Sequence, residues 1–412
     1  MKIPLALSGL RPQDVQAAIQ VLQSGNLTMG NQVRNFEQEV AKYLNVKHFI
    51  MMNSGSSANL AIFEALLRPT QRTPFLNPGD GVLVPVIAWP TTIWPIVQLG
   101  LQPIFVDVDP ETYAIDLEKA QIAINGSDLN VRAIFPIHPL GKAIDPDKLE
   151  KFADTNNLVL INDVCESLGS WIGTKHAGTC GLGGSFSFYF SHHITTMEGG
   201  GVATNDSEFA DDLRSIRSHG WSRDRTDAEY WQNNVSNNDA KFLFVSTGFN
   251  VRPMEVQAAV GISQIADLDL FIEKRRILAR RINEAILNTD LRLVGAKTFE
   301  NSINEKSHSW MLMPIQVIGK NAKERKTAII AKLEELGVET RPVLTGNFLS
   351  QPSMQRIGKN LPDASEFDIA NEISSTTFLV SGHHDLDQAQ IQYLCDSLQV
   401  ASNFYSNQQE LN

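Results

Sequence analysis

The sequence of 412 residues predicts an α/β fold: a large domain built on a mainly parallel sheet, followed by a smaller α+β domain. Short apolar, β-branched runs recur through the first half and alternate with helical stretches, which is typical of parallel strands buried on both faces. An amphipathic stretch then leads into a second series of strand and helix patterns. A hydrophobic content of 42% is ample for the cores of two domains.

Apolar runs predict the strands of the large domain, at 48–52, 82–86, 103–107, 132–136 and 158–162. A further strand is expected at 201–204, followed by a helix that begins near Ser207 and ends near Gly220. In open sheets of this kind, ligands bind at the carboxyl ends of the strands and in the loops that follow. We therefore expect the functional residues in those loops.

The domain boundary is expected near residue 252, with a large domain of residues 1–252 and a connector helix plus small C-terminal domain of residues 253–412. Apolar residues at helical spacing mark the connector at 255–286, which also carries the basic cluster Lys274, Arg275 and Arg276. Beyond it the patterns predict a strand at 310–317 and helices at 322–336 and 387–398.

Charge and cysteine content exclude several classes of function. The net charge of −11 leaves no basic surplus, so nucleic acid is not expected as a partner. The sequence begins without a signal-peptide pattern, and no apolar run approaches the roughly 20 residues of a membrane helix, so we expect a cytoplasmic protein. The three cysteines, Cys165, Cys180 and Cys395, show no metal-binding spacing, so neither disulfides nor a metal site is expected.

A small-residue turn follows the first predicted strand. The segment Asn53-Ser-Gly-Ser-Ser-Ala-Asn-Leu60 leads from strand to helix, so Gly55 and Ser56 lie where backbone N–H groups and hydroxyls are presented to an anion. Such turns also cap many helices for structural reasons alone. By itself, this segment favours the structural interpretation.

An acidic residue, Asp163, ends the strand predicted at 158–162. A buried carboxylate is costly without a partner, so Asp163 requires a cation or hydrogen-bond donors. A protonated pyridine nitrogen would serve, because keeping that ring charged makes pyridoxal phosphate an electron sink. A helix cap or a structural ion pair explains the residue equally well from the sequence alone.

A longer motif connects these residues. The segment Gly183-Gly-Ser-Phe-Ser-Phe-Tyr-Phe-Ser-His-His-Ile-Thr-Thr-Met-Glu-Gly-Gly-Gly201 resembles the cofactor-lysine segment of the DegT/DnrJ/EryC1/StrS sugar aminotransferases, in which Ser/Thr-Lys-Asn precedes a Glu/Asp-Gly-Gly turn. Aligned in this way, His192 takes the place of the lysine and His193 that of the asparagine. The resemblance implies the aspartate aminotransferase fold (fold type I), with a mainly parallel seven-stranded sheet, and pyridoxal 5'-phosphate or pyridoxamine 5'-phosphate as cofactor.

The same resemblance implies roles for residues elsewhere. Trp89 matches the aromatic residue that stacks on the cofactor ring, Asp163 the carboxylate that faces the pyridine nitrogen, and Glu166 a position near the phenolic oxygen. The positions that match phosphate-binding residues are Gly55, Ser56 and Ser187. Asn250 matches an asparagine that reaches the cofactor phosphate of the neighbouring subunit, which implies a homodimer with shared active sites.

Three further residues are candidates for contact with the substrate. Arg223 and Arg252 have the bidentate geometry that suits carboxylates and diphosphates, with structural ion pairing as the alternative. For His193, an orienting role is favoured over a direct catalytic one. We keep all three as candidate substrate residues.

A narrower resemblance within the family covers nearly the whole chain. The double histidine and the segments 27–30, 219–223, 250–253 and 341–348 are similar to the GDP-4-keto-6-deoxymannose 3-dehydratases of colitose and O-antigen biosynthesis. The resemblance implies removal of the C3 hydroxyl of a nucleotide-linked 4-keto-6-deoxyhexose, with glutamate as amino donor and release of ammonia. A related histidine-bearing subgroup carries an iron–sulfur cluster on downstream cysteines. Because no cysteine lies between Asp206 and Leu394, we expect no such cluster.

Histidine changes what this position can do. An imidazole forms no stable covalent bond with the coenzyme, so the coenzyme must be held noncovalently, but with a pKa of about 6.5 against about 10.4 for lysine it is a good base near neutral pH. Two other interpretations remain: a nucleotide-sugar 4-aminotransferase, or a lysine-replaced variant of one, and a noncatalytic sugar-nucleotide sensor. The nucleotide, the sugar stereochemistry and the pathway rest on resemblance alone.

Overall fold

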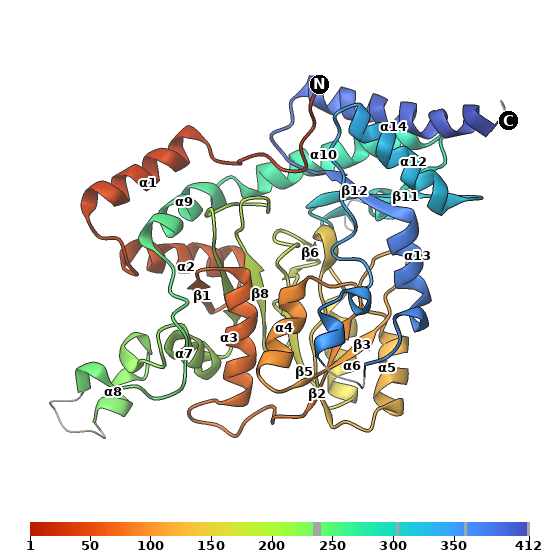
Figure 1. Cartoon of the computed structure of the whole chain (residues 1–412). Coiled ribbons are helices and arrows are strands. Elements are labelled where there is room, and N and C mark those ends of the chain that lie inside the picture. The colour runs from red at the N-terminus through yellow and green to blue at the C-terminus, as the bar shows by residue number, and fades with distance from the viewer. Residues whose placement is uncertain (234–239, 302–304, 358–360, 410–412) are drawn as a thin grey trace.

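The structure is a computed structural model that describes residues 1–233, 240–301, 305–357 and 361–409 (Figure 1). Its centre is a seven-stranded sheet with the order β1 (His48–Met52), β9 (Gly200–Thr204), β8 (Gly183–Ser187), β5 (Val159–Asp163), β4 (Val131–Ile134), β2 (Gly81–Pro85) and β3 (Gln102–Val106). Only β9 runs against the others, since it pairs antiparallel with both β1 and β8. The predicted α/β class with a mainly parallel sheet is confirmed.

Helices cover both faces of this sheet, because successive strand residues point to opposite sides. Val82, Val84 and Ile161 face one hydrophobic core, whereas Leu83 and Leu160 face another. The first core is completed by α3 (Gly55–Leu67), α4 (Pro90–Gln98) and α7 (Ser207–Ile216), and the second by α5 (Leu117–Gly126) and α6 (Pro146–Thr155). Burial on both sides explains the continuous apolar runs of the sequence.

The predicted connector at 255–286 forms two helices, α9 (Glu255–Ile265) and α10 (Leu268–Ile286). Helix α9 packs on α1 (Pro12–Ser24) and α2 (Asn31–Leu44), at the outer edge of the large sheet. The start of helix α10 is buried, through Phe271, in the hydrophobic core that also contains residues of α2 and α9. Its later part is buried, through Leu278 and Ile282, in the core of the C-terminal part. It therefore passes from one core to the other.

The C-terminal part is a three-stranded antiparallel sheet with the order β10 (Leu291–Leu293), β11 (Leu312–Val317) and β12 (Thr377–Ser381). Helices α12 (Ala322–Glu335) and α14 (Gln388–Gln409) cover it beside α10, at the top of Figure 1, and α13 (Asp368–Thr376) precedes β12. Ile3 is buried in this core, and its N–H donates to the carbonyl oxygen of Gly337 at 2.9 Å. The first residues of the chain thus pack with the C-terminal core.

The remaining elements are short: the hairpin of β6 (Trp171–Ile172) and β7 (Lys175–His176), and the helix α8 (Ala228–Gln232). Residues 343–357 and 361–373 return from the C-terminal part to the core of the large sheet, where Val343, Phe348 and Ile373 are buried. Within the described ranges, no helix combines the length and the apolar character needed to cross a membrane.

Candidate active site

A cavity of 550 Å³ lies at the carboxyl ends of the central strands. Its walls come from the loops after β1, β2, β5 and β8, and from the C-terminal part through Met311, Arg341 and Leu344. The sequence-predicted residues that the structure brings together here are Gly55, Ser56, Trp89, Asp163, Glu166, Ser187 and His192. No lysine is among the residues that line this cavity.

One end of the cavity is formed by the amino terminus of α3. Ser54 caps the helix by accepting a hydrogen bond from the N–H of Ser57 at 3.1 Å. A Cβ atom on Gly55 would lie 2.7 Å from the Cβ of Ser187 and 2.9 Å from the Sγ of Cys165, so only glycine allows this close approach. Helix N–H groups and serine hydroxyls therefore converge, as a phosphate requires.

Asp163 lies at the end of β5, and its side chain is held by three donors. Its Oδ2 accepts from the Nδ2 of Asn59 at 3.0 Å and from the Oγ1 of Thr92 at 2.8 Å, and its Oδ1 accepts from the N–H of Cys165 at 3.2 Å. The residue is 5% exposed, and no cation of the described chain forms an ion pair with it. A buried carboxylate of this kind fits a ligand that brings its own positive charge, such as a pyridinium nitrogen.

Trp89 forms a wall of the cavity. It occupies the N-cap position of α4, whose start is fixed by Pro90, and it is 49% exposed. A large aromatic ring left open at the mouth of a cavity offers its face for stacking on a planar ligand.

His192 lies in the loop between β8 and β9. Its Nδ1 is 2.7 Å from the carbonyl oxygen of Cys165, which can only accept, so Nδ1 carries the proton and Nε2 keeps its lone pair. Burial lowers the pKa of His192 to about 3, and the positive charges of Arg275 and Arg341 act in the same direction. The imidazole is therefore neutral at physiological pH and its Nε2 has a free lone pair, but the lowered pKa makes it a weaker base than the reference value of about 6.5 implies.

Glu166 follows on the same loop as Asp163. Its Oε2 accepts a hydrogen bond from the N–H of Leu140 at 2.8 Å. Burial raises the pKa of Glu166, whereas the charge of Arg341 and the Leu140 hydrogen bond act against this rise. A carboxyl group with a raised pKa beside the cavity suits hydrogen bonding to an oxygen of a bound ligand.

His193 points away from the cavity. It is 1% exposed, its Nε2 lies 3.3 Å from the carbonyl oxygen of Ser309, and it is absent from the cavity wall. Its orienting role therefore stays a prediction.

Three predicted residues lie elsewhere in this chain. Arg223 lines a separate hollow of 450 Å³ and stacks on the ring of Trp221, with 4.0 Å between the guanidinium carbon and the ring centroid. The Nε of Arg252 donates to the Oδ1 of Asn250 at 3.0 Å, and Asn250 is exposed. Of the three, only Asn250 was predicted to serve the site of a neighbouring subunit, and the structure of the single chain does not place Arg223 or Arg252 in the cavity. The predicted roles of all three stay predictions.

Arg341 is a cavity residue that the sequence analysis gave no role. Within the described part of the chain its guanidinium forms no ion pair, although its charge acts on both Glu166 and His192. An unpaired guanidinium in a cavity is suited to bind a carboxylate or phosphate. The sequence analysis also assigned no role to Asn59 and Thr92, which donate to Asp163. The signal that could have identified them is a polar residue within an otherwise apolar helix pattern.

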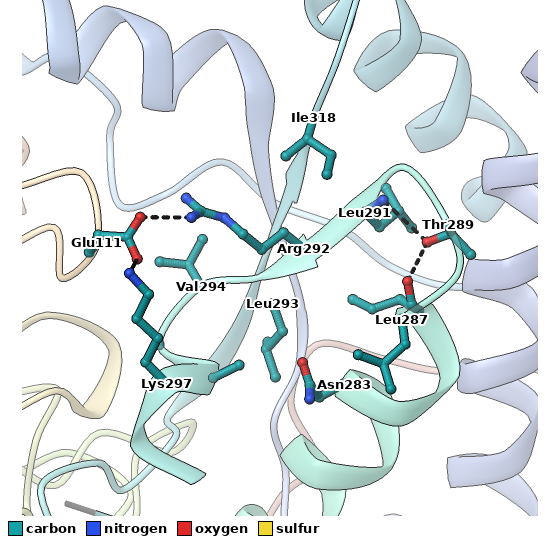
Figure 2. Close-up of a pocket in the computed structure, with 13 residues that line it drawn as sticks. Glu111, Asn283, Leu287, Thr289, Leu291, Arg292, Leu293, Val294, Lys297 and Ile318 are labelled. Carbon is teal, nitrogen blue, oxygen red and sulfur yellow. Dashed lines mark hydrogen bonds and ion pairs between the residues drawn. The ribbon is translucent and has the colours of Figure 1, made fainter. Parts of the chain in front are cut away.

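A different hollow, of 260 Å³, lies in the C-terminal part beside the end of α10 and β10 (Figure 2). Glu111, from the loop after β3, forms ion pairs there with Arg292 at 2.7 Å and Lys297 at 2.9 Å. Apolar side chains, among them Leu287, Leu293, Val294 and Ile318, form much of the rest of its wall (Figure 2). Because the two cations share Glu111, this hollow joins the two parts of the molecule.

Together, sheet and cavity define the class: the fold is that of the pyridoxal-phosphate-dependent enzymes of the aspartate aminotransferase type. The chain belongs to the DegT/DnrJ/EryC1/StrS aminotransferase family, whose sequence model matches residues 9–399. A GDP-4-keto-6-deoxy-D-mannose 3-dehydratase from Yersinia pseudotuberculosis is 34% identical over 94% of this chain and 95% of its own length.

Two solved structures are similar over the whole fold. The GDP-4-keto-6-deoxy-D-mannose 3-dehydratase of E. coli with bound hydrated pyridoxal phosphate has a TM-score of 0.85 and 32% identity, covering 97% of this chain and 99% of that one. A GDP-4-keto-6-deoxymannose 3-dehydratase with a trapped adduct of pyridoxal phosphate and glutamate has a TM-score of 0.84 and 32% identity, covering 96% and 100%. The predicted fold and cofactor class are thereby confirmed.

Proposed function

We propose that this protein is a sugar 3-dehydratase that uses pyridoxal or pyridoxamine phosphate to remove the C3 hydroxyl of a nucleotide-linked 4-keto-6-deoxyhexose, with GDP-4-keto-6-deoxy-D-mannose as the expected substrate. One observation carries the proposal: His192, with Nε2 unprotonated, lies in a cavity whose walls contain no lysine. The names of the similar dehydratases support the substrate.

The cavity residues fit a coenzyme held without a covalent bond. The amino terminus of α3 and the hydroxyl of Ser187 would hold its phosphate, Asp163 its ring nitrogen and Trp89 one face of its ring. When bound, the coenzyme supplies an electron sink for carbanion chemistry. Since His192 cannot form the covalent link that a lysine makes, these contacts must provide all of the binding.

In this proposal His192 is the base. Its Nε2 would take up a proton from carbon, the electrons of that C–H bond would expel the C3 hydroxyl as hydroxide, which becomes water on protonation, and the hydrogen bond from Nδ1 to Cys165 keeps the ring in the required tautomer. A flexible lysine amine would deliver a proton to C4 and complete a transamination. In this chain the lysine is replaced by an imidazole whose Nδ1 is held 2.7 Å from the main-chain carbonyl oxygen of Cys165. Because this ring is not a flexible amine that can deliver a proton to C4, elimination is favoured over transamination.

Glutamate is the proposed source of electrons. The balance is glutamate plus ketosugar to 2-oxoglutarate, ammonia and the 3-deoxy ketosugar: the glutamate α-carbon is oxidised, and the C3–OH bond of the sugar is replaced by C3–H. The unpaired guanidinium of Arg341 is the group of this chain suited to hold a glutamate carboxylate in the cavity. The trapped glutamate adduct of the similar dehydratase supports this donor.

We further propose a cytoplasmic homodimer without an iron–sulfur cluster. In such a dimer, Asn250 would reach the cofactor phosphate of the partner, and Arg223 and Arg252 would approach the negatively charged parts of its ligand. The exposure of Asn250 in the single chain leaves it open to such a contact.

The test is a product analysis. Purified protein is incubated with pyridoxal phosphate, glutamate and GDP-4-keto-6-deoxy-D-mannose, and the sugar nucleotides are analysed by mass spectrometry with a parallel assay for ammonia. A 3-deoxy ketosugar with equimolar ammonia is expected. An aminosugar would instead identify an aminotransferase, and binding without turnover would identify a sensor; either result contradicts the proposal.

A further inference from the structure

Arg275 is a cation buried completely inside the protein, on α10. Its exposed fraction is 0%, and no carboxylate of the described chain forms an ion pair with it. Its partners are the carbonyl oxygens of Trp310, Met311, Gly382 and His192 and the Nδ1 of His384, and its Nε has no partner. Burial of a charge without a counter-ion is strongly unfavourable, so this arrangement requires an explanation beyond packing.

The guanidinium joins three segments that are far apart in the sequence. Nη1 donates to Met311, just before β11, and to Gly382, just after β12, both at 2.9 Å. Nη2 donates to the carbonyl oxygen of His192 at 3.1 Å, in the loop between β8 and β9. The planar fork of arginine can make these bonds in diverging directions, which the single ammonium of lysine cannot reproduce.

We propose that Arg275 is the positioning residue of the base: it ties the main chain of His192 to the residues that flank the central strand β11 and the edge strand β12 of the C-terminal sheet, and it places a buried positive charge behind the imidazole. The inference rests on the proposed role of His192. Two hydrogen bonds thus fix the base, the one from Nδ1 to Cys165 in the loop after β5 and the one from Arg275 to its main chain. The position of the base therefore depends on the C-terminal part of the chain, which does not itself carry His192.

The charge of Arg275 also acts on the proton affinity of the base. Arg275 on α10 and Arg341 in the C-terminal part are the cations that face His192, and both lower its pKa, after burial as the main cause. The acidic groups around the same cavity are Asp163 at the end of β5, Glu166 in the loop after it and Glu198 on the loop of His192. Asp385 is the carboxylate whose charge acts on Arg275 itself. Other titratable neighbours are Cys165, Tyr189 and His193. Removing Arg275 should therefore make the imidazole easier to protonate.

A metal site is the competing explanation for the polar groups around Arg275. In the described part of the chain, His383, His384 and Asp385 offer ligand atoms within 4.8 Å of one another. The Nδ1 of His384, however, lies 3.4 Å from Nη2 of Arg275, and its ring stacks on Phe271 with centroids 4.1 Å apart. A cation there would lie beside a guanidinium, so we interpret this cluster as the packing that encloses Arg275.

The experiment compares Arg275→Gln, which removes the charge, with Arg275→Lys, which keeps it but loses the fork. Arg276→Gln is the matched control, because Arg276 is the next residue on the same helix and donates to the carbonyl oxygen of His308 instead. In the coenzyme-free protein, the onset of His192 protonation is followed by NMR down to the pH at which circular dichroism first detects unfolding, and the His192 signal is identified by its loss in His192→Asn. Dehydration by the loaded enzyme is measured in parallel as a function of pH.

We expect the His192 titration to move upward by about one pH unit or more in Arg275→Gln and to stay in place in Arg275→Lys and Arg276→Gln. Dehydration should fall about tenfold or more in Arg275→Lys, because the base is no longer held in place. An unchanged titration in Arg275→Gln, or full activity in Arg275→Lys, overturns the inference; if Arg275→Gln does not fold, Arg275→Lys alone decides. Failure of the wild-type protein to dehydrate the sugar would instead refute the proposed function, whereas the NMR titration would still test the charge behind His192.

Discussion

The Nδ1 atom of His192 lies 2.7 Å from the carbonyl oxygen of Cys165, and this contact decides which nitrogen of the ring can act as a base. Cys165 is two residues beyond Asp163, and its own N–H donates to that carboxylate. The end of β5 therefore carries Asp163, the residue suited to the coenzyme nitrogen, and the short loop after it carries Cys165, whose carbonyl oxygen fixes the tautomer of His192. The two functions are coupled by backbone geometry, which a mutation in this loop would disturb together.

The variant His192→Lys should convert the site. We expect a covalent bond between the new amine and the coenzyme, and a loss of dehydration of about 100-fold or more, because the fixed base is replaced by a flexible amine. Mass spectrometry after borohydride reduction detects the bond, and product analysis follows the reaction. His192→Asn is the control and should lose dehydration without covalent labelling. Unchanged dehydration in His192→Lys would remove the residue from its assigned role.

Much of this fold could be predicted because its signals are local. The strands β1 and β5 are encoded as apolar runs that are followed by, or end in, polar or small residues, so the sequence alone places Gly55 in the turn after β1 and Asp163 at the end of β5. Family resemblance then supplied His192 and Trp89, which no local pattern distinguishes from an ordinary loop residue. The cavity confirms that these residues lie together.

The missed residues depend on contacts between distant segments. Thr92 and Asn59 reach Asp163 from two different helices, and no sequence pattern encodes that meeting. Arg275 belongs to a basic cluster in the sequence, yet it lies on the same helical face as Phe271 and Leu278, four residues before it and three after. The helical spacing thus contained the signal that this arginine is buried.

The variant Gly55→Ala should impair coenzyme binding and stability. The added methyl group would lie 2.7 Å from the Cβ of Ser187 and 2.9 Å from the Sγ of Cys165, so β8 and the start of α3 must move apart. We expect a destabilisation of about 1–3 kcal/mol and weaker binding of pyridoxal phosphate, measured by urea unfolding and by absorbance titration. Gly126→Ala, where nothing lies within 4 Å of the new methyl group, should change neither. Equal behaviour of the two variants would refute the role of this close approach.

The ion pairs of Glu111 in Figure 2 should contribute little to stability. Its side chain is 39% exposed, so Glu111→Gln should lower the free energy of unfolding by about 1 kcal/mol or less, and high salt should remove the difference. Lys297 and then Arg292 hold the pKa of Glu111 below its ordinary value. The contribution is therefore present above the unfolded-state pKa and is lost as pH falls through the lower folded-state value. Urea unfolding at two salt concentrations measures it, and a loss that salt does not affect would contradict an electrostatic origin.

Buried neutral histidines should make the protein sensitive to mild acid, and His138 is the clearest case. It is 0% exposed; its Nδ1 accepts from the N–H of Ile144 at 3.0 Å, so its Nε2 donates to the Oδ1 of Asn162 at 3.2 Å. Burial lowers the pKa of His138 to about 4. Below the unfolded-state pKa of about 6.5, the unfolded chain therefore binds a proton that the folded chain does not.

Stability should accordingly be constant with respect to this group above about pH 6.5 and fall by up to about 1.4 kcal/mol per pH unit between that value and the folded-state pKa. His138→Gln should be less stable than the wild type at about pH 8, because it loses a buried hydrogen bond, but its stability should fall less steeply on acidification. Urea unfolding across this pH range measures both effects. His48→Gln, at the partly exposed start of β1, should leave most of the slope intact. Parallel pH profiles for the wild type and His138→Gln would mean that His138 is already protonated in the folded protein, or that its pKa does not differ between the folded and unfolded states.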